Sequence, residues 1–254
     1  MKIRALVQAR TSSKRLPLKV LLPIGEYLLL EHIFLRLAQI KKNNLEVALA
    51  IPQGDEKLIR FSQEKGLTYY EGDEFDVLAR FLHASSDLDD HDFVVRLTGD
   101  NPFLDYGSLA EILETLETIH ADYIYPRGLP LGMGFEIIRV AALRAQKFYE
   151  LEDHHKEHVT TFIKEKRHLF EIVPLGFGPL YHPEIDQIEE IPLRLTVDEE
   201  KDLEMARKLY THFAALKNPL FRAQEVVELY RRYPHFFSVN RDVRQKSPRE
   251  AERS

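Results

Sequence analysis

Strand-like segments alternate with segments of helical periodicity along the first half of this chain, and no other feature limits its fold as much. Ile3 to Gln8 is a short apolar run typical of a buried strand, and Leu28 to Ile40 carries apolar residues at helical spacing. The same order recurs as far as Tyr125. Repeated units of this kind fold as a mostly parallel sheet covered by helices, so we predict an α/β fold. Strands are expected at 3–8, 46–51, 67–70, 93–97 and 123–125, and helices at 28–40, 55–65, 76–86 and 109–119.

The second half of the chain is less regular. Residues 126–183 are richer in glycine, proline and histidine, and we expect a helix near 156–166 and a strand at 170–173 there. We assign residues 126–190 to acceptor binding or dimerisation, within one domain that comprises residues 1–243. The remaining expected elements are a strand at 193–197, helices at 200–216 and 223–233, and a disordered tail at 244–254.

Composition and charge exclude several classes of protein. The chain has no cysteine, which excludes disulfides, thiolate zinc sites and a catalytic thiol. Its net charge of −6 argues against a general nucleic-acid binder but leaves room for a local basic pocket. The apolar start is too short for a signal peptide, and no apolar run has the length of a membrane span. We therefore expect a cytoplasmic protein with no nucleic-acid partner and no membrane insertion.

A basic loop, QARTSSKRLPLK, follows the first expected strand. It contains Arg10, Lys14, Arg15 and Lys19 beside several hydroxyl side chains. Guanidinium groups pair with phosphate oxygens, lysine supplies a mobile charge, and amides and hydroxyls satisfy the remaining lone pairs. Because α/β sheets bind ligands at the carboxyl ends of their strands, the loop is a candidate triphosphate site, which Pro17 would stiffen. The alternative is a solvated, charged loop.

The pattern R-L-T-x-D occurs twice, each time at the end of an expected strand. Its two copies end in Asp100 and Asp198. Mg²⁺ is typically held by one or two carboxylates together with substrate phosphates, so two aspartates beside a triphosphate would form a magnesium site. The alternative is that both aspartates form turns, or that Asp198 caps the helix that follows.

The basic loop resembles the signature xxARxxSxRLPxK of the cytidylyltransferase family, which includes CMP-Kdo and CMP-sialic acid synthetases. The resemblance is strongest to the branch of spore coat polysaccharide biosynthesis proteins called SpsF-like. It implies that Arg10, Ser13, Arg15 and Lys19 bind the phosphates of CTP, and that Arg15 and Lys19 also stabilise the pyrophosphate as it leaves. The loop departs from the family at Leu18, where glycine is usual, and just beyond it Tyr27-Leu28 replaces a common Lys-Pro pair.

Further motifs extend this resemblance over residues 3–203. The family's GDxP and VDxxxDL segments occur here, and they imply that Asp100 and Asp198 hold Mg²⁺. The family's G-x-x-D-V-L-x-R segment implies that Asp76 and Arg80 lie beside the nucleotide. For Asp76 a helix cap is the alternative.

The resemblance also implies an acceptor site and a fold. The glycine turn GMGFE ends in Glu136, which would lie near the sugar hydroxyls, although a plain entry into a strand is an equal alternative for the glycines. The segment KEHVT resembles REHVT of the SpsF-like branch, and implies that Glu157 and His158 face the acceptor. The family's fold is a three-layer, nucleotide-diphospho-sugar transferase-like (Rossmann-like) α/β fold with a mostly parallel mixed sheet.

A zinc site is the main rival for the histidine-rich segment. His154 to His158 spells H-x-x-E-H, in which two histidines one helical turn apart ligate zinc in some peptidases. A third ligand is not evident, and an exposed polar helix start explains the same residues. We prefer the polar helix start.

These observations lead us to expect an enzyme that transfers CMP from CTP to a sugar or nonulosonic acid and releases pyrophosphate. In-line attack of a hydroxyl on the α-phosphorus, assisted by Mg²⁺, needs no covalent enzyme intermediate. A homodimer working in surface polysaccharide synthesis is expected from the resemblance. Two alternatives are a nucleotide-sugar-dependent glycosyltransferase, which the RLPxK loop disfavours, and a catalytically silent sugar-nucleotide-binding protein, which the departures at Leu18 and Tyr27-Leu28 suggest.

Overall fold

A seven-stranded mixed sheet forms the centre of the computed structural model, which describes residues 1–176 and 178–245. The strand order is β5-β4-β1-β6-β8-β7-β9, and β8 is antiparallel to both of its neighbours while the other pairs are parallel. The predicted mostly parallel α/β fold is therefore confirmed. The strands are β1 (Ile3–Gln8), β4 (Leu45–Pro52), β5 (Thr68–Gly72), β6 (Phe93–Thr98), β7 (Tyr123–Arg127), β8 (Glu136–Arg139) and β9 (Ile172–Gly176).

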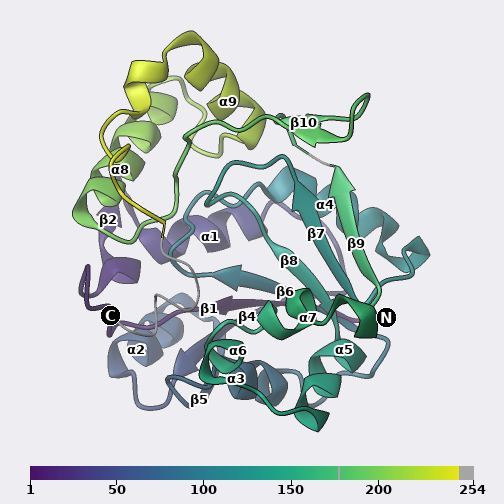
Figure 1. The fold of residues 1–254 in the computed structure, drawn as a ribbon. Coiled ribbons are helices and arrows are strands. Elements are labelled where there is room, and N and C mark those ends of the chain that lie inside the picture. The colour runs from purple at the N-terminus through teal and green to yellow at the C-terminus, as the bar shows by residue number, and fades with distance from the viewer. Residues whose placement is uncertain (177, 246–254) are drawn as a thin grey trace.

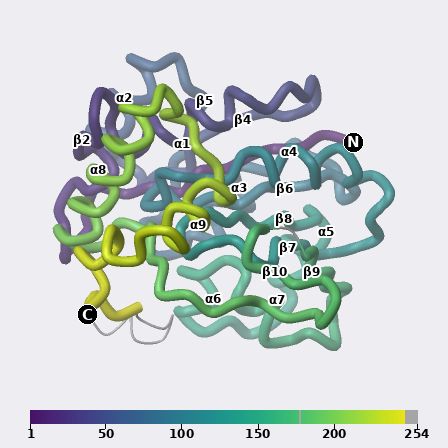
Figure 2. Tube along the Cα trace, turned by 90° about the horizontal axis from the view of Figure 1, so that it is seen from above, coloured from purple at the N-terminus to yellow at the C-terminus, as the bar shows by residue number. Residues whose placement is uncertain are grey.

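Helices cover both faces of the sheet because successive strand side chains point to opposite sides. On β1, Ala5 and Val7 pack in the core cluster that contains α1, α2 and α4, whereas Leu6 packs with α3, α5 and the α6–α7 region. Figure 2 shows α1 and α2 on one side of the molecule and α6 and α7 on the other. These helices are α1 (Leu29–Leu37), α2 (Glu56–Lys65), α3 (Val77–Ala84), α4 (Tyr106–Thr115), α5 (Val140–Ala145), α6 (Asp153–Glu157) and α7 (Thr161–Glu165).

A third cluster of buried apolar residues lies at one end of the sheet. Helices α8 and α9 lie together there (Figure 1), and they pack on Leu16 of the basic loop and on the extended segment 193–197. Between β9 and α8 in the sequence, a small hairpin extends from the body of the molecule in Figure 1. The further elements are α8 (Glu200–Ala215), α9 (Ala223–Arg232), the hairpin strands β10 (Tyr181–His182) and β11 (Gln187–Ile188), the short pair β2 (Pro23–Ile24) and β3 (Tyr27–Leu28), and the 3₁₀ turns η1 (Lys19–Leu21), η2 (Leu116–Thr118), η3 (Gln146–Phe148), η4 (Arg167–Leu169) and η5 (Pro234–Phe237).

The predicted strand at 193–197 is wrong. Apart from one isolated bridge between Leu131 and Arg194, the segment pairs with no strand of the described chain. Its amides instead bond to two separate loops, Leu195 N to Leu131 O at 2.8 Å and Val197 N to Asp100 O at 2.8 Å. Leu193, Leu195 and Val197 alternate with polar residues as in a strand, and they do so because these three side chains pack on α8 and α9.

Two other expectations differ from the structure in the second half. The single helix expected near 156–166 is broken at His158, whose backbone (φ −107°, ψ 77°) ends α6 before α7 begins. Of the tail expected at 244–254, residues 246–254 lie outside the described residues, and Gln245 contacts Arg194. Within the described chain, no helix combines the length and the apolar character that crossing a membrane requires.

The basic loop turns sharply at Leu18, which has a left-handed backbone conformation (φ 59°, ψ 17°). Its amide donates to Thr11 O at 3.2 Å, and its carbonyl accepts from Leu21 N at 2.8 Å. The side chain of Asp55, at the start of α2, anchors the loop by accepting from both N and Oγ1 of Thr11. The glycine that is usual at this position in the family would adopt this conformation without strain, and Leu18 adopts it as well.

We expect Leu18→Val to lower the free energy of unfolding by about 1–2 kcal/mol, because a β-branched residue is strained in the left-handed region. Leu18→Gly should stay within about 1 kcal/mol of the wild type, since relief of backbone strain offsets the greater freedom of the unfolded chain. Denaturant unfolding of the three proteins measures both effects. Equal stability of the valine variant and the wild type would contradict the assigned loop conformation.

Candidate active site

The side chain of Lys19 joins the basic loop to the two R-L-T-x-D aspartates. Its Nζ lies 2.9 Å from Asp100 Oδ2, 2.8 Å from Asp198 Oδ1 and 3.0 Å from the carbonyl oxygen of Val197. Burial by itself would lower the pKa of Lys19, but the two carboxylates outweigh it and raise the pKa. The ammonium is therefore charged and is enclosed by oxygen atoms.

The basic loop and Asp100 meet because β1 and β6, the strands that precede them, end at the same level. Gln8, the last residue of β1, is in register with Thr98, the last residue of β6. Gly99 then passes so close to β1 that its amide donates to Gln8 O at 2.7 Å, and a Cβ on Gly99 would lie 2.9 Å from that oxygen. The loop after β1 and Asp100 after β6 are consequently neighbours.

Arg15 completes the cluster around Asp198. Its Nη2 lies 3.1 Å from Asp198 Oδ1, and its Nη1 lies 3.4 Å from Glu199 Oε1. Burial would raise the pKa of Asp198, but Lys19 and then Arg15 and Arg194 outweigh it and lower the pKa. The structure thus brings the basic loop together with both aspartates.

The same cluster fits a divalent cation. The carboxylates of Asp100 and Asp198 and the carbonyl of Val197 direct three oxygen atoms at one cationic nitrogen. Hard cations such as Mg²⁺ take carboxylate and carbonyl oxygens together with waters and phosphates. Asp100 and Asp198 would hold such an ion.

A second cationic region lies beside the loop. Arg10 Nη2 donates to Glu157 Oε1 at 3.0 Å, which links the basic loop to α6. Arg80 is 2% exposed, and its Nε and Nη1 have no hydrogen-bond partner among the described residues. Burial and the nearby charge of Arg10 lower the pKa of Arg80 to about 10. A buried guanidinium in this state favours an anionic ligand.

Two other predicted nucleotide contacts have structural partners. Asp76 Oδ1 accepts from Ala79 N at 2.7 Å, so this side chain caps α3, as the alternative reading of the sequence proposed. Ser13 Oγ accepts from Leu16 N at 3.4 Å inside the loop. Their contact with a nucleotide remains a prediction.

A cavity of about 440 Å³ opens beside Asn101, one residue beyond Asp100. Glu136, the first residue of β8, lies in its wall, where Arg96 Nη1 and Lys164 Nζ each lie 2.5 Å from its carboxylate. Burial would raise the pKa of Glu136, but Arg96 and Lys164 outweigh it and lower the pKa to about 2. Glu136 is therefore an ionised acceptor of hydrogen bonds in a cavity next to the aspartate cluster.

The other partners of Glu136 could not be found from local patterns. Tyr123 and Thr160 donate hydroxyl hydrogen bonds to its carboxylate, from β7 and from the break between α6 and α7. The one partner of Glu136 that lies in a recognised motif is Arg96, the arginine of the first R-L-T-x-D copy. His158, predicted at the acceptor, lies at the same break and is half-buried.

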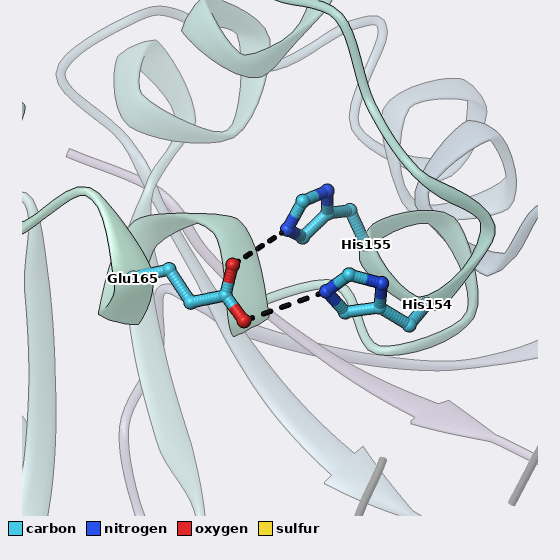
Figure 3. Close-up of side chains that lie close together, drawn as sticks. All are labelled: His154, His155 and Glu165. Atoms are coloured by element: carbon cyan, nitrogen blue, oxygen red, sulfur yellow. Dashed lines mark hydrogen bonds and ion pairs between the residues drawn. The ribbon is translucent and has the colours of Figure 1, made fainter. Parts of the chain in front are cut away.

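The rival zinc interpretation of the H-x-x-E-H segment pairs His154 with His158, whereas the structure groups His154 with His155 and Glu165. His154 and His155 are buried, which also corrects the expectation of an exposed helix start, and both point at Glu165 of α7 (Figure 3). Within the described part of the chain, these three side chains form the group of at least three His, Asp or Glu residues whose ligand atoms lie close enough together to hold one metal ion. The amide of Glu152 donates to Nδ1 of His155 at 3.1 Å, so Nε2 carries the proton and donates to Glu165 at 2.9 Å. A metal needs an unprotonated nitrogen, so this geometry favours a hydrogen-bonded cluster.

Comparison with known proteins agrees with this geometry. A family model described as cytidylyltransferase matches residues 4–228. Spore coat polysaccharide biosynthesis protein SpsF of Bacillus subtilis is 31% identical over 239 residues, which cover 90% of this chain and 94% of that protein. An uncharacterized protein of Methanocaldococcus jannaschii is 32% identical over 253 residues, which cover 99% of this chain and all of the relative.

Solved structures share the fold. A cytidylyltransferase from Leptospira borgpetersenii superposes with a TM-score of 0.80 at 23% identity and covers 97% of this chain and 99% of its own. A CMP-2-keto-3-deoxy-manno-octonic acid synthetase complexed with CTP has a TM-score of 0.62 at 15% identity and covers 84% and 99%. From the family model and the SpsF relative together, the chain belongs to the cytidylyltransferase family.

Proposed function

We propose that this chain transfers CMP from CTP to a sugar or nonulosonic acid, with Mg²⁺, and releases pyrophosphate. The observation that carries the proposal is the ammonium of Lys19 held between Asp100 and Asp198 at the end of the basic loop. The SpsF relative supports a role in surface polysaccharide synthesis, and we assign a cytoplasmic homodimer to that role.

The cationic residues of the loop would bind the triphosphate. Arg15 and Lys19 contact Asp198, and Arg10 lies near Arg80, whose Nε and Nη1 have no hydrogen-bond partner among the described residues. Fixed positive groups in a partly buried site stabilise the charge that develops as pyrophosphate leaves. A divalent cation held by Asp100 and Asp198 would neutralise phosphate charge and lower the pKa of the attacking hydroxyl.

The cavity beside Asn101 would bind the acceptor. Its volume of about 440 Å³ is within the range of small-molecule sites, and the ionised Glu136 can accept hydrogen bonds from sugar hydroxyls. Glu157 faces Arg10, so we infer that it couples the acceptor segment to the nucleotide loop. We place His158 at the acceptor edge, because the chain leaves α6 there towards Thr160 and Glu136.

The observed loop argues against a catalytically silent binding protein. Leu18 adopts the left-handed conformation that glycine would adopt, so the departure from the family leaves the turn intact. Lys19 and Arg15, which follow and precede that turn, both reach Asp198. The arrangement of the side chains proposed to bind phosphate therefore supports turnover.

We expect CTP with Mg²⁺ and a suitable acceptor to release pyrophosphate, while ATP, GTP and UTP give little. A panel of sugar acids, neutral sugars and sugar phosphates, assayed by coupled pyrophosphate detection, measures this. Release of a nucleoside mono- or diphosphate from a nucleotide-sugar donor, with no pyrophosphate from any triphosphate, would instead support a glycosyltransferase.

Asp100→Asn and Asp198→Asn should each reduce turnover by about 10²- to 10³-fold, because each removes a charged oxygen ligand from the proposed cation site. Asp90→Asn is the matched control, since Asp90 pairs with Arg144 on the surface. The control should keep wild-type rates. Initial rates of pyrophosphate release, with thermal unfolding of each protein, make the comparison. Wild-type rates in either site variant would refute the site assignment.

Glu136→Gln should raise the KM for the acceptor by about tenfold, because it weakens charge-assisted hydrogen bonds, and leave the KM for CTP unchanged. The lowered pKa, about 2, means that Glu136 stays ionised as pH rises from there. The defect should therefore be constant from about pH 5 to about pH 9. Steady-state kinetics at several pH values measure it. A defect that disappears at the acid end of this range would show that Glu136 titrates there, against the assigned environment.

A further inference from the structure

The two carboxylate oxygens of Asp198 face different partners. Oδ1 lies towards Lys19 and Arg15, on the side of the proposed cation. Oδ2 accepts from Nη2 of Arg194 at 2.7 Å, and the side chain of Arg194 is only 8% exposed. Oδ1 thus faces the site, and Oδ2 is bound by Arg194 on the opposite side of the carboxylate.

Arg194 is itself fixed by a buried carboxylate. Its Nε donates to Asp202 Oδ1 at 3.0 Å, its Nη2 also reaches Asp202 Oδ2 at 3.3 Å, and its Nη1 donates to Gln245. The Asp202 side chain is 0% exposed, and its Oδ2 accepts from the amides of Asp198 at 3.0 Å and of Glu199 at 3.1 Å. The side chain and the backbone of Asp198 are therefore bound to the same unit.

Asn240 closes this unit from the C-terminal part of the chain. Its side-chain amide donates to Arg194 O at 2.9 Å and to Asp202 Oδ1 at 2.8 Å, and the residue is 3% exposed. Asn240 follows η5, so a segment more than forty residues from Asp198 supports that carboxylate.

The two R-L-T-x-D copies use their arginines differently. Arg194 binds the aspartate of its own copy, whereas Arg96 binds Glu136 in the acceptor cavity. The side chain of Asp100 is also more exposed than that of Asp198, 28% against 13%. The support behind Asp198 is therefore specific to the second copy.

We propose that Arg194, with Asp202 and Asn240, is a positioning residue that fixes Asp198 so that Oδ1 alone is presented to the divalent cation. The proposal rests on the proposed function, which places the cation at Asp100 and Asp198. A carboxylate can bind a cation through one oxygen or through both. A hydrogen bond from arginine to Oδ2 leaves only Oδ1 for the cation and so selects binding through one oxygen. Groups that orient a ligand in this way typically contribute 10- to 100-fold to metal affinity.

The test measures Mn²⁺ binding in the presence of CTP, from the electron paramagnetic resonance signal of free Mn²⁺, without acceptor and without turnover. We expect Arg194→Gln to raise the Mn²⁺ dissociation constant by about 10- to 100-fold. Arg194→Lys should restore part of the affinity, because lysine keeps one charged donor but not the fork. Asn240→Ala should weaken binding by a smaller factor.

Arg4→Gln is the matched control. Arg4 is also buried, at 4% side-chain exposure, and bridges Glu46 and Asp87 near the other end of β1. Both glutamine variants should lower the melting temperature, but Arg4→Gln should leave Mn²⁺ affinity unchanged. A merely structural role of Arg194 would make the two variants alike in both measurements.

Asp198→Asn separates failure of this inference from failure of the proposed function. If Asp198→Asn binds Mn²⁺ as tightly as the wild type, the cation is not at Asp198 and the proposed function fails. If Asp198→Asn loses affinity while Arg194→Gln keeps it, the positioning role is overturned and the function stands. Should Arg194→Gln fail to fold, wild-type affinity in both Arg194→Lys and Asn240→Ala overturns the role equally.

Discussion

The ammonium of Lys19 between Asp100 and Asp198 is the interaction on which the arrangement of this site depends. It joins three parts of the chain that are distant in sequence: the loop after β1, the end of β6 and the segment before α8. Two carboxylates that converge on one point repel each other, and a buried cation removes that repulsion. The triphosphate and cation of the proposed function carry charges complementary to these cationic and anionic side chains, so interactions already present in the protein would organise the site for that ligand.

The acceptor cavity and the aspartate cluster are connected by packing as well as by proximity. Gly132, in the wall of the cavity, has φ +95°, and a Cβ there would lie 2.3 Å from the amide nitrogen of Thr196. Thr196 lies two residues before Asp198, on the segment that α8 and α9 hold in place. Leu195 N also donates to Leu131 O, so the glycine turn and the segment that leads to Asp198 are held together by packing and by a hydrogen bond. The sequence had left these glycines as either a site turn or a plain entry into a strand, and the close approach explains why Gly132 is required.

The regular elements and the loop chemistry could be predicted from the sequence because they depend on local patterns. Hydrophobic periodicity located β1 and the α/β order, and the charges around Arg15 located the basic loop that meets Asp198. The failures have long-range causes. The alternation at 193–197 is produced by packing on two helices, His155 is buried by contacts with Glu165, and Asn240 reaches Asp202 across the fold. Local sequence carries no record of such contacts, because the same R-L-T-x-D spacing pairs Arg194 with Asp198 in the second copy but Arg96 with Glu136 in the first.

Arg80 favours an anionic ligand, because its Nε and Nη1 have no hydrogen-bond partner among the described residues. A buried guanidinium without hydrogen-bond acceptors is unfavourable, and the charge of Arg10 nearby makes it more so, which is why the pKa of Arg80 falls. Glu157 accepts a hydrogen bond from Arg10 and none from Nε or Nη1 of Arg80. No other described residue supplies an acceptor for these two atoms. An anion that reaches both arginines removes this unfavourable term on binding, and it therefore stabilises the folded state by mass action. In the proposed function, the free energy of nucleotide binding would include relief of this unfavourable charge arrangement at α3, in addition to contacts with Lys19 and Arg15.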